Sequence, residues 1–304
     1  MSKPLVYLDQ NIIGLQLSGG LRLEKRDDLV WVYSTEHLSE ISRSSNADQY
    51  LAALEHIGAK FLRLVLAVDW KITGTAELVE GSPEQHYSDY MRTKIEVPVD
   101  ETLFDPLVAW VNGGGDEDLL KQFPEKLTAQ ISTLIDTSAY DGLREQVSSL
   151  DPLLGRAVQQ MIQNGSSITE TRKALGVAKG RIGGIDGEDP IAEIWNIIGP
   201  SCGSLTRDQF FGFDPAEKQG YEAWPLYLGI VGCCGVLDIL GFQSEKKCRR
   251  IEKIPNVRSD SSHIAMGAFC SMLLTEDKRL AKRAYAIYRH KNISTRVLLF
   301  RGAS

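Results

Sequence analysis

Four acidic residues occupy positions from which their carboxylates could act together. Asp9 ends an apolar run near the N-terminus, and Asp277 lies two residues after Thr275, the last residue of a second apolar run. Glu40 and Asp260 fall in segments with helical character. Two carboxylates about 4 Å apart repel each other by roughly 1 kcal/mol in water and roughly 4 kcal/mol at an effective dielectric near 20, so a group of them needs a cation to stay ionised. Hard oxygen ligands favour Mg²⁺ or Mn²⁺ over zinc.

Histidines accompany two of these acids. In the segment STEHLSEI, His37 precedes Glu40 by three residues, which places both side chains on one face of a helix. In SDSSHIAMGAF, Asp260 stands in the predicted first turn of a helix and His263 follows three residues later. Each histidine is therefore one helical turn from an acid, and we expect both rings beside the site.

Strands and helices alternate near both ends of the chain. Apolar, β-rich runs predict strands at 4–8 and 29–33, and Ser34 is the predicted N-cap of the helix that contains Glu40. The C-terminal region predicts a helix, a strand, an amphipathic helix and a final strand, at 259–272, 272–275, 276–289 and 295–300. This alternation predicts an α/β fold with a parallel sheet built from both termini. Ligands of such sheets bind beyond the carboxyl ends of the strands, where Asp9 and Asp277 fall.

A long acidic stretch separates the two terminal regions. Residues 46–242 contain 15 Lys and Arg against 29 Asp and Glu. Apolar residues recur at helical spacing in three parts of it, 50–66, 119–135 and 143–162. We therefore predict a core made of residues 1–45 plus 245–304, and a mostly α-helical insertion at 46–244. The insertion is expected to serve as a substrate lid, an interface between copies of the chain, or a docking surface for a regulatory protein.

The composition excludes several classes of protein. Hydrophobic residues make up 43% of the chain and charged residues 24%, which argues against disordered and collagen-like proteins. The longest uncharged apolar stretch, 223–237, is shorter than the ~20 residues of a membrane-spanning helix and contains Pro225. No leader pattern opens the chain, so we expect a cytoplasmic protein without a membrane partner. The five cysteines form no CxxC pair, which favours buried thiols over a zinc site or a disulfide framework.

The net charge of −6 hides a basic C-terminal region. Residues 243–304 contain 14 Lys and Arg against five Asp and Glu, so a polyanion is expected to bind there. In the amphipathic helix, the periodicity leaves Arg283 and its basic neighbours for solvent or phosphate. The predicted nucleic-acid contacts are Lys246, Lys247, Arg249, Arg250, Lys278, Arg279 and Lys282. Four aromatic residues could stack on bases, although aromatic residues at this density are more typical of a core: Trp195, Tyr221, Trp224 and Tyr227.

These residues together resemble the PIN-like metal-dependent nucleases. The resemblance rests on the strand-terminal YLDQN, the helical Glu, the late DxxHxAxxA and the strand ending LLTED, within about residues 3–45 and 255–300. It implies a PIN-like core in which four acids gather in one pocket as catalytic and metal-binding residues: Asp9, Glu40, Asp260 and Asp277. It also implies that four residues lie beside this pocket: Asn11, His37, His263 and Thr275. The inserted segment departs from the compact family pattern and leaves the substrate open.

The resemblance implies hydrolysis of phosphodiester bonds with Mg²⁺ or Mn²⁺ as cofactor. A bound metal lowers the pKa of a water ligand, orients that water towards phosphorus and neutralises the leaving oxygen. We expect Asp9 and Asp277 to bind the metal directly, Asp260 to bind it directly or through water, and Glu40 to orient water or bind a second ion. Family habit favours an endoribonuclease, with RNA preferred to DNA as the partner, and the architecture suits a toxin or phage-defence effector.

Other interpretations remain open at this point. The chain could be a DNA nuclease, or a non-catalytic nucleic-acid-binding regulator that retains the fold. A phosphatase of the haloacid-dehalogenase type also starts from a strand-terminal Asp, but it requires a second Asp two positions later, where this chain has Asn11. Taken singly, Asp260 and Asp277 could each be a helix N-terminal charge, and Glu40 an exposed helix carboxylate.

Overall fold

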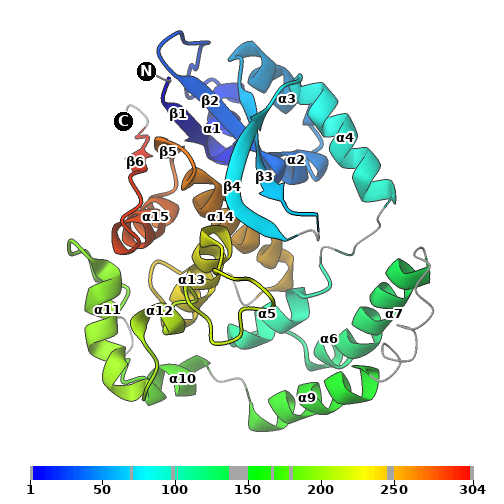
Figure 1. Ribbon diagram of the computed structural model, residues 1–304, viewed down its shortest axis with the longest axis vertical. Helices are drawn as coiled ribbons and strands as arrows, with labels where there is room; N and C mark the ends of the chain where they lie inside the picture. Colours follow the sequence, from blue (N-terminus) through cyan, green and yellow to red (C-terminus); the bar gives the residue numbers. More distant parts are fainter. Residues whose placement is uncertain are drawn as a thin grey trace.

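The computed structural model of the protein describes residues 3–68, 71–96, 100, 102–136, 150–165, 168–177, 181–244 and 250–301. One six-stranded sheet lies in the order β4-β3-β2-β1-β5-β6 (Figure 1). The strands are β1 (Leu5–Leu8), β2 (Val30–Ser34), β3 (Lys60–Leu66), β4 (Ile72–Val79), β5 (Met272–Thr275) and β6 (Arg296–Leu299). Neighbouring strands run parallel, except that β4 pairs antiparallel to β3. The predicted α/β class with a mostly parallel sheet is confirmed, and β1 from the N-terminal region pairs directly with β5 from the C-terminal region.

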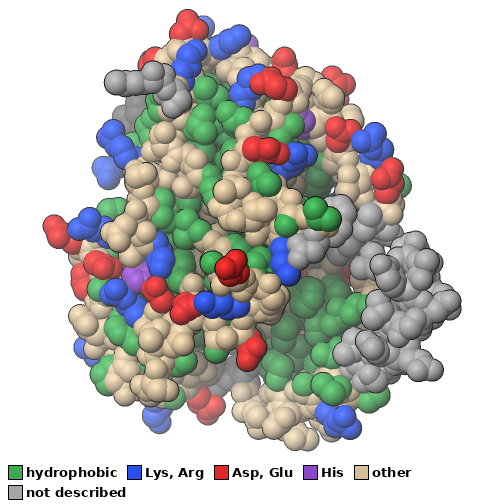
Figure 2. Space-filling view, viewed as in Figure 1, with side chains coloured by type: hydrophobic (Ala, Val, Ile, Leu, Met, Phe, Trp, Pro, Cys, Tyr) green, Lys and Arg blue, Asp and Glu red, His purple; other side chains and the backbone are tan. Residues whose placement is uncertain are grey.

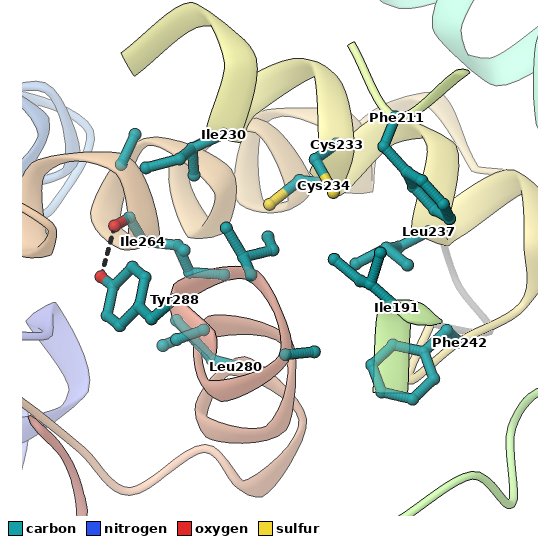
Figure 3. Close-up of a cluster of buried hydrophobic side chains, with 14 of the residues drawn as sticks. Ile191, Phe211, Ile230, Cys233, Cys234, Leu237, Phe242, Ile264, Leu280 and Tyr288 are labelled. Atoms are coloured by element: carbon teal, nitrogen blue, oxygen red, sulfur yellow. Dashed lines mark hydrogen bonds between the residues drawn. The ribbon is translucent and has the colours of Figure 1, made fainter. Parts of the chain in front are cut away.

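Helices cover both faces of the sheet. Alternate side chains of β1 point to opposite faces, so Val6 and Leu8 belong to one hydrophobic core and Tyr7 to the other. The helices packed in the Val6 core are α1 (Gln10–Leu17), α2 (Thr35–Ser42), α3 (Ala47–His56) and α4 (Pro83–Glu96). Those of the Tyr7 core are α11 (Pro190–Ile198), α13 (Leu226–Leu240), α14 (Ile254–Gly267) and α15 (Lys278–His290). Figure 3 shows part of this second core, where the Tyr288 hydroxyl donates to the Ile264 carbonyl oxygen at 2.5 Å.

The remaining described elements are α5 (Asp105–Val111), α6 (Glu117–Lys121), α7 (Phe123–Asp136), α9 (Leu150–Asn164), α10 (Ile168–Ala174), η2 (Gly199–Ser201), α12 (Arg207–Phe210) and η3 (Ile251–Lys253). Among them, α5, α6, α7, α9, α10 and α12 lie below the sheet in the view of Figure 1. A small third core joins α6, α7 and α9 through Leu120, Phe123 and Val158. Hydrophobic side chains gather near α5 and α6 in the space-filling view (Figure 2). Within the described ranges, no helix has the length and apolar character needed to cross a membrane.

The sheet extends past the predicted core boundary at residue 45. The helix predicted over 50–66 is wrong beyond His56, because the chain turns at Gly58, which has a φ of +63°, and then forms β3. Phe61 pairs with Tyr33 of β2, and Leu62 packs in the core on the other face. Residues 46–79, assigned in the prediction to the mostly α-helical insertion at 46–244, therefore contribute two strands to the sheet. Residues 143–149 of another predicted helix lie outside the described residues.

Candidate functional site

Asp9 lies at the edge of the sheet where β1 and β5 end side by side. Its N–H donates to the Leu274 carbonyl oxygen at 2.9 Å, and its carboxylate oxygen Oδ2 accepts from Thr275 Oγ1 at 2.7 Å. Asn11 Nδ2 lies 3.4 Å from the same oxygen. The Asp9 side chain is buried. The first strand and the fifth strand therefore build this end of the site together, as the sequence predicted from their polar ends.

Asp277 is held next to Asp9 through the hydroxyl of Thr275. The Asp277 N–H donates to Thr275 Oγ1 at 3.0 Å, and the same hydroxyl donates to Asp9. Asp277 also caps α15, since its Oδ1 accepts from the backbone N–H groups of Arg279 and Leu280 at 2.6 and 3.2 Å. One oxygen of Asp277 thus stabilises the helix start, while Oδ2 lies 3.4 Å from the Arg279 guanidinium.

Asp260 lies beyond the first turn of α14, so its predicted first-turn position is wrong. The helix already begins at Ile254, and Pro255 lies in its first turn. Proline is favoured there because the N–H groups of a first turn have no partner within the helix, so the N–H that proline lacks is not missed. A stabilising interaction with the helix dipole at the N-terminus therefore does not explain Asp260. The pKa of Asp260 is raised to about 7, because burial and the negative charges of Asp9 and Asp277 together outweigh the positive charges of Arg283 and His263.

Glu40 of α2 and the buried His263 of α14 form an ion pair in which the Glu40 side chain is partly exposed. His263 Nε2 lies 3.6 Å from Glu40 Oε2, and Ser259 Oγ donates to Glu40 Oε1. Burial opposes the ionised form of Glu40, but His263 and Ser259 outweigh it and lower the Glu40 pKa to about 2. Burial likewise opposes protonation of His263, but Glu40 outweighs it and raises the His263 pKa to about 9. His263 is therefore a cation at neutral pH, and its Nδ1–H donates to the Tyr7 hydroxyl at 2.9 Å.

His37 is a neutral residue that connects three segments of backbone. Its Nδ1 accepts from the Ser34 N–H at 3.0 Å, and its Nε2–H donates to the Leu8 carbonyl oxygen at 2.7 Å. Burial and the nearby charge of His263 lower the His37 pKa to about 3. The two histidine rings lie 4.8 Å apart, so His37 is beside the site as expected, but both of its nitrogens are occupied by the scaffold.

The charges of the four predicted acids act on one another, but only Glu40 and Asp260 line a common cavity. Burial raises the pKa of Asp9, and the charges of Glu40 and Asp277 raise it further. A cavity of about 300 Å³ opens beside them, lined by Asn11, Glu40, Arg43, Asn256 and Asp260. The donors are carboxylate, amide and hydroxyl oxygens, which fit Mg²⁺ or Mn²⁺ in type. Among the described residues, however, no group of three or more His, Cys, Asp and Glu side chains lies in position to hold a metal ion.

The predicted basic contacts have varied surroundings. Arg250 and Lys278 are exposed, Arg279 pairs with Asp277, and Lys282 pairs with Asp186 at 2.8 Å. Three members of the predicted set lie outside the described residues: Lys246, Lys247 and Arg249.

Arg283 does not face solvent or phosphate as predicted. It is 3% exposed, and its guanidinium donates to the Cys234 carbonyl oxygen and to Asp238 Oδ2, each at 3.0 Å. The spacing of apolar residues along α15 predicts which face of the helix is buried. It does not predict that Arg283 on this helix pairs with Asp238 of α13. The positive charge of Arg283 opposes the rise in the pKa of Asp260.

Two further cavities adjoin the acidic one. A cavity of about 340 Å³ shares Arg43 with it, and a cavity of about 560 Å³ shares Thr35 and Glu36 with the second cavity. Glu36 was not among the predicted site residues. Its four-residue spacing from Glu40 was the available signal, because this spacing places both carboxylates on one helix face.

The four candidate base-stacking aromatics have different environments. Trp195 packs against Phe210, with ring centroids 5.9 Å apart, and Tyr221 contacts Trp224 at 5.4 Å. Tyr227 instead lines the cavity of about 560 Å³, and its hydroxyl donates to Ser262 Oγ at 3.2 Å. Tyr227 is therefore well placed to meet a ligand in that cavity.

Comparison of the chain with protein-family models, curated proteins and solved structures found no match in any of the three.

Proposed function

We propose that this chain is a metal-dependent endonuclease with a PIN-like core that hydrolyses phosphodiester bonds, and that its substrate is RNA. The supporting observation is the mutual repulsion of carboxylates at the carboxyl edge of the sheet. Burial and neighbouring acids raise the pKa of Asp9 and that of Asp260. A divalent cation relieves such repulsion, since it favours the ionised form of each carboxylate.

The roles of the acids follow from their contacts. Asp9, Asp260 and Asp277 would hold the metal, with the Thr275 hydroxyl orienting Asp9. When bound, Mg²⁺ or Mn²⁺ supplies an activated water and stabilises charge on the phosphate. Glu40 is engaged by His263 and Ser259, so it orients the two helices that flank the cavity and is suited to accept a hydrogen bond from water there.

The choice of nucleic acid rests on the resemblance to PIN-like nucleases and on the surroundings of the acids. An acidic site repels a polyanion, so cations must bind the phosphates nearby. Arg43 is exposed and lines both the acidic cavity and the next one. Lys278 is exposed one residue from Asp277. These side chains are suited to bind phosphates on either side of the scissile bond.

A cleavage assay tests this function directly. We expect the purified chain to cut single-stranded RNA in Mg²⁺ or Mn²⁺, to cut single- and double-stranded DNA more slowly, and to cut nothing in EDTA. The measurement is fragment formation on denaturing gels. Faster cleavage of DNA would make the chain a DNA nuclease. A shift of RNA on native gels without any cleavage would indicate a non-catalytic regulator and contradict the proposed activity.

Thermal melting tests the shared metal site without activity. Mn²⁺ is expected to raise the melting temperature of the wild type, but not that of an Asp9→Asn/Asp277→Asn double variant, because binding to the native state alone stabilises it. Asn is chosen since it keeps the helix cap that Asp277 provides. The matched control is Asp189→Asn, which makes the same change at the N-cap of α11. Equal Mn²⁺ shifts in all three proteins would contradict a site shared by Asp9 and Asp277.

A further inference from the structure

Three cavities follow one another through shared lining residues, beginning with the one that Glu40 and Asp260 line. The acidic cavity and the second cavity meet at Arg43, and the second and third meet at the start of α2, at Thr35 and Glu36. The second cavity is also lined by Arg258, whose guanidinium lies 3.0 Å from Asp105. Arg43 and Arg258 in its lining suit phosphate. The third cavity also contains an arginine, Arg63, but its guanidinium is paired with Glu77 of the same cavity at 2.7 Å, which leaves this cavity for the uncharged part of a nucleotide.

The third cavity has the lining of a small-molecule site. Its volume of about 560 Å³ lies within the range of roughly 300–1,000 Å³ that such sites occupy. Leu64, Met266 and Tyr227 supply apolar and aromatic surface, and Glu36 supplies a carboxylate at the junction with the second cavity. A flat apolar ring with polar edges matches this combination, because stacking needs the apolar wall and the edge needs a hydrogen-bond partner.

Glu36 has an unusual position for a groove that binds a polyanion. Its carboxylate lies close to the hydroxyl groups of Ser262 and Tyr227, of which the Tyr227 hydroxyl donates to Ser262 Oγ at 3.2 Å. Burial raises the pKa of Glu36, and the positive charges of His263 and Arg258 oppose this rise. The Glu36 carboxylate repels the phosphates of a bound nucleic acid. Its oxygen lone pairs therefore need N–H donors from another part of that ligand. Exposed base edges are the part of a nucleic acid that offers such donors.

We propose that the third cavity binds the base of a nucleotide adjacent to the scissile phosphate and that Glu36 selects guanine. This inference rests on the proposed nuclease function. Guanine presents N1–H and the N2 amino group side by side, which matches the two oxygens of one carboxylate. Adenine and cytosine present a single amino group beside a bare ring nitrogen, which repels the second oxygen. Uracil presents one N–H between two carbonyl groups, which repel it on both sides. Base selection also requires a single-stranded substrate, since a paired guanine has no free Watson–Crick edge.

Binding of mononucleotides tests this assignment without cleavage. Calorimetric titration of the full chain in EDTA with GMP, AMP, CMP and UMP is expected to show GMP binding at least about tenfold more tightly than the other three. Glu36→Gln should weaken GMP binding about tenfold and reduce the preference, because Gln offers one acceptor and one donor. Glu36→Asp keeps the carboxylate and should retain part of the preference. Glu84→Gln, on the exposed surface of α4, is the matched control.

The outcomes separate this inference from the proposed function. Sequencing of cleaved RNA should show guanine enriched at one position beside the cut in the wild type, and that enrichment should be lost in Glu36→Gln. Cleavage without any base preference, or equal affinity for the four nucleotides, would overturn the assignment of the cavity while the nuclease function stands. Selective GMP binding by a chain that cuts no nucleic acid would overturn the nuclease and leave the guanine site. The comparison of the four nucleotides on the wild-type chain tests the assignment even if a Glu36 variant fails to fold.

Discussion

Replacing Asp260 by Asn is expected to reduce cleavage at least about 100-fold. Substitution of residues that support metal ligands already costs roughly 10–100-fold in affinity or activity, and a residue that holds the metal should cost more. The measurement is the rate of RNA cleavage in saturating Mn²⁺. Asp48→Asn, an exposed acid in the first turn of α3, is the control and should cleave at the wild-type rate. Unchanged cleavage by Asp260→Asn would remove this carboxylate from the reaction.

The same substitution is expected to stabilise the metal-free protein at alkaline pH. The pKa of Asp260 rises from its ordinary value of 3.8 to about 7 in the folded chain, so the folded state binds the proton more tightly than the unfolded state. Stability then falls as pH rises from about 4 to about 7, and the loss is complete above pH 7. At about 1.4 kcal/mol per pKa unit, this loss amounts to at most about 4 kcal/mol.

Melting curves in EDTA at pH 5 and pH 8 measure this effect. Asp260→Asn should melt above the wild type at pH 8, and the difference should shrink at pH 5. A lower melting temperature for Asp260→Asn at both values would show that the carboxylate stabilises the fold, contrary to the proposed role. A gain in stability together with a loss of cleavage would be typical of a residue that is retained for chemistry.

Replacing His263 by Ala is expected to destabilise the folded protein. The substitution leaves the mostly buried Glu40 without its cation, which costs about 3 kcal/mol and lowers the melting temperature of a chain of this length by about 5 °C. Thermal melting at pH 6 measures the loss. His56→Ala, at the exposed C-terminal end of α3, is the matched control and should change the melting temperature little. An equal effect of the two substitutions would contradict a stabilising ion pair.

The stabilisation by this pair should have a defined pH window. The pKa of His263 is raised to about 9, so its contribution is complete below the unfolded value of 6.5 and disappears as pH rises through 9. The pKa of Glu40 is lowered to about 2, so its contribution is complete above the unfolded value of 4.5 and disappears as pH falls through 2. The difference between wild type and His263→Ala should therefore be largest between about pH 4.5 and 6.5. A difference that is constant from pH 3 to 10 would exclude the ion pair as its cause.

Local pattern predicted the elements whose signals are strong and short. β1, β2, β5 and β6 lie within one residue of the predicted strands, because uninterrupted apolar runs are typical of buried parallel strands. Ser34 caps α2 as predicted, since its side chain accepts from a backbone N–H in the first turn. The pattern failed for β3, where the apolar residues between Lys60 and Leu66 fit a helix as well as a strand. Pairing with β2, which the local pattern does not contain, decides between them.

The residue types and their order in the chain determined which side chains could form the site: a strand-terminal Asp at each end of the chain, and an acid with a histidine on each of two helices. Only the tertiary structure decided which of these side chains are charged and which are buried. His263 is charged because Glu40 lies beside it, while His37 is neutral because it is fully buried and lies close to the positive charge of His263. Likewise, Arg283 can be buried because it forms an ion pair with Asp238 of another helix. The physical reason is that the protonation of a side chain depends on its desolvation and on charges a few ångströms away. Those charges can come from distant segments, as Glu40 and His263 do, which are more than 200 residues apart in the chain.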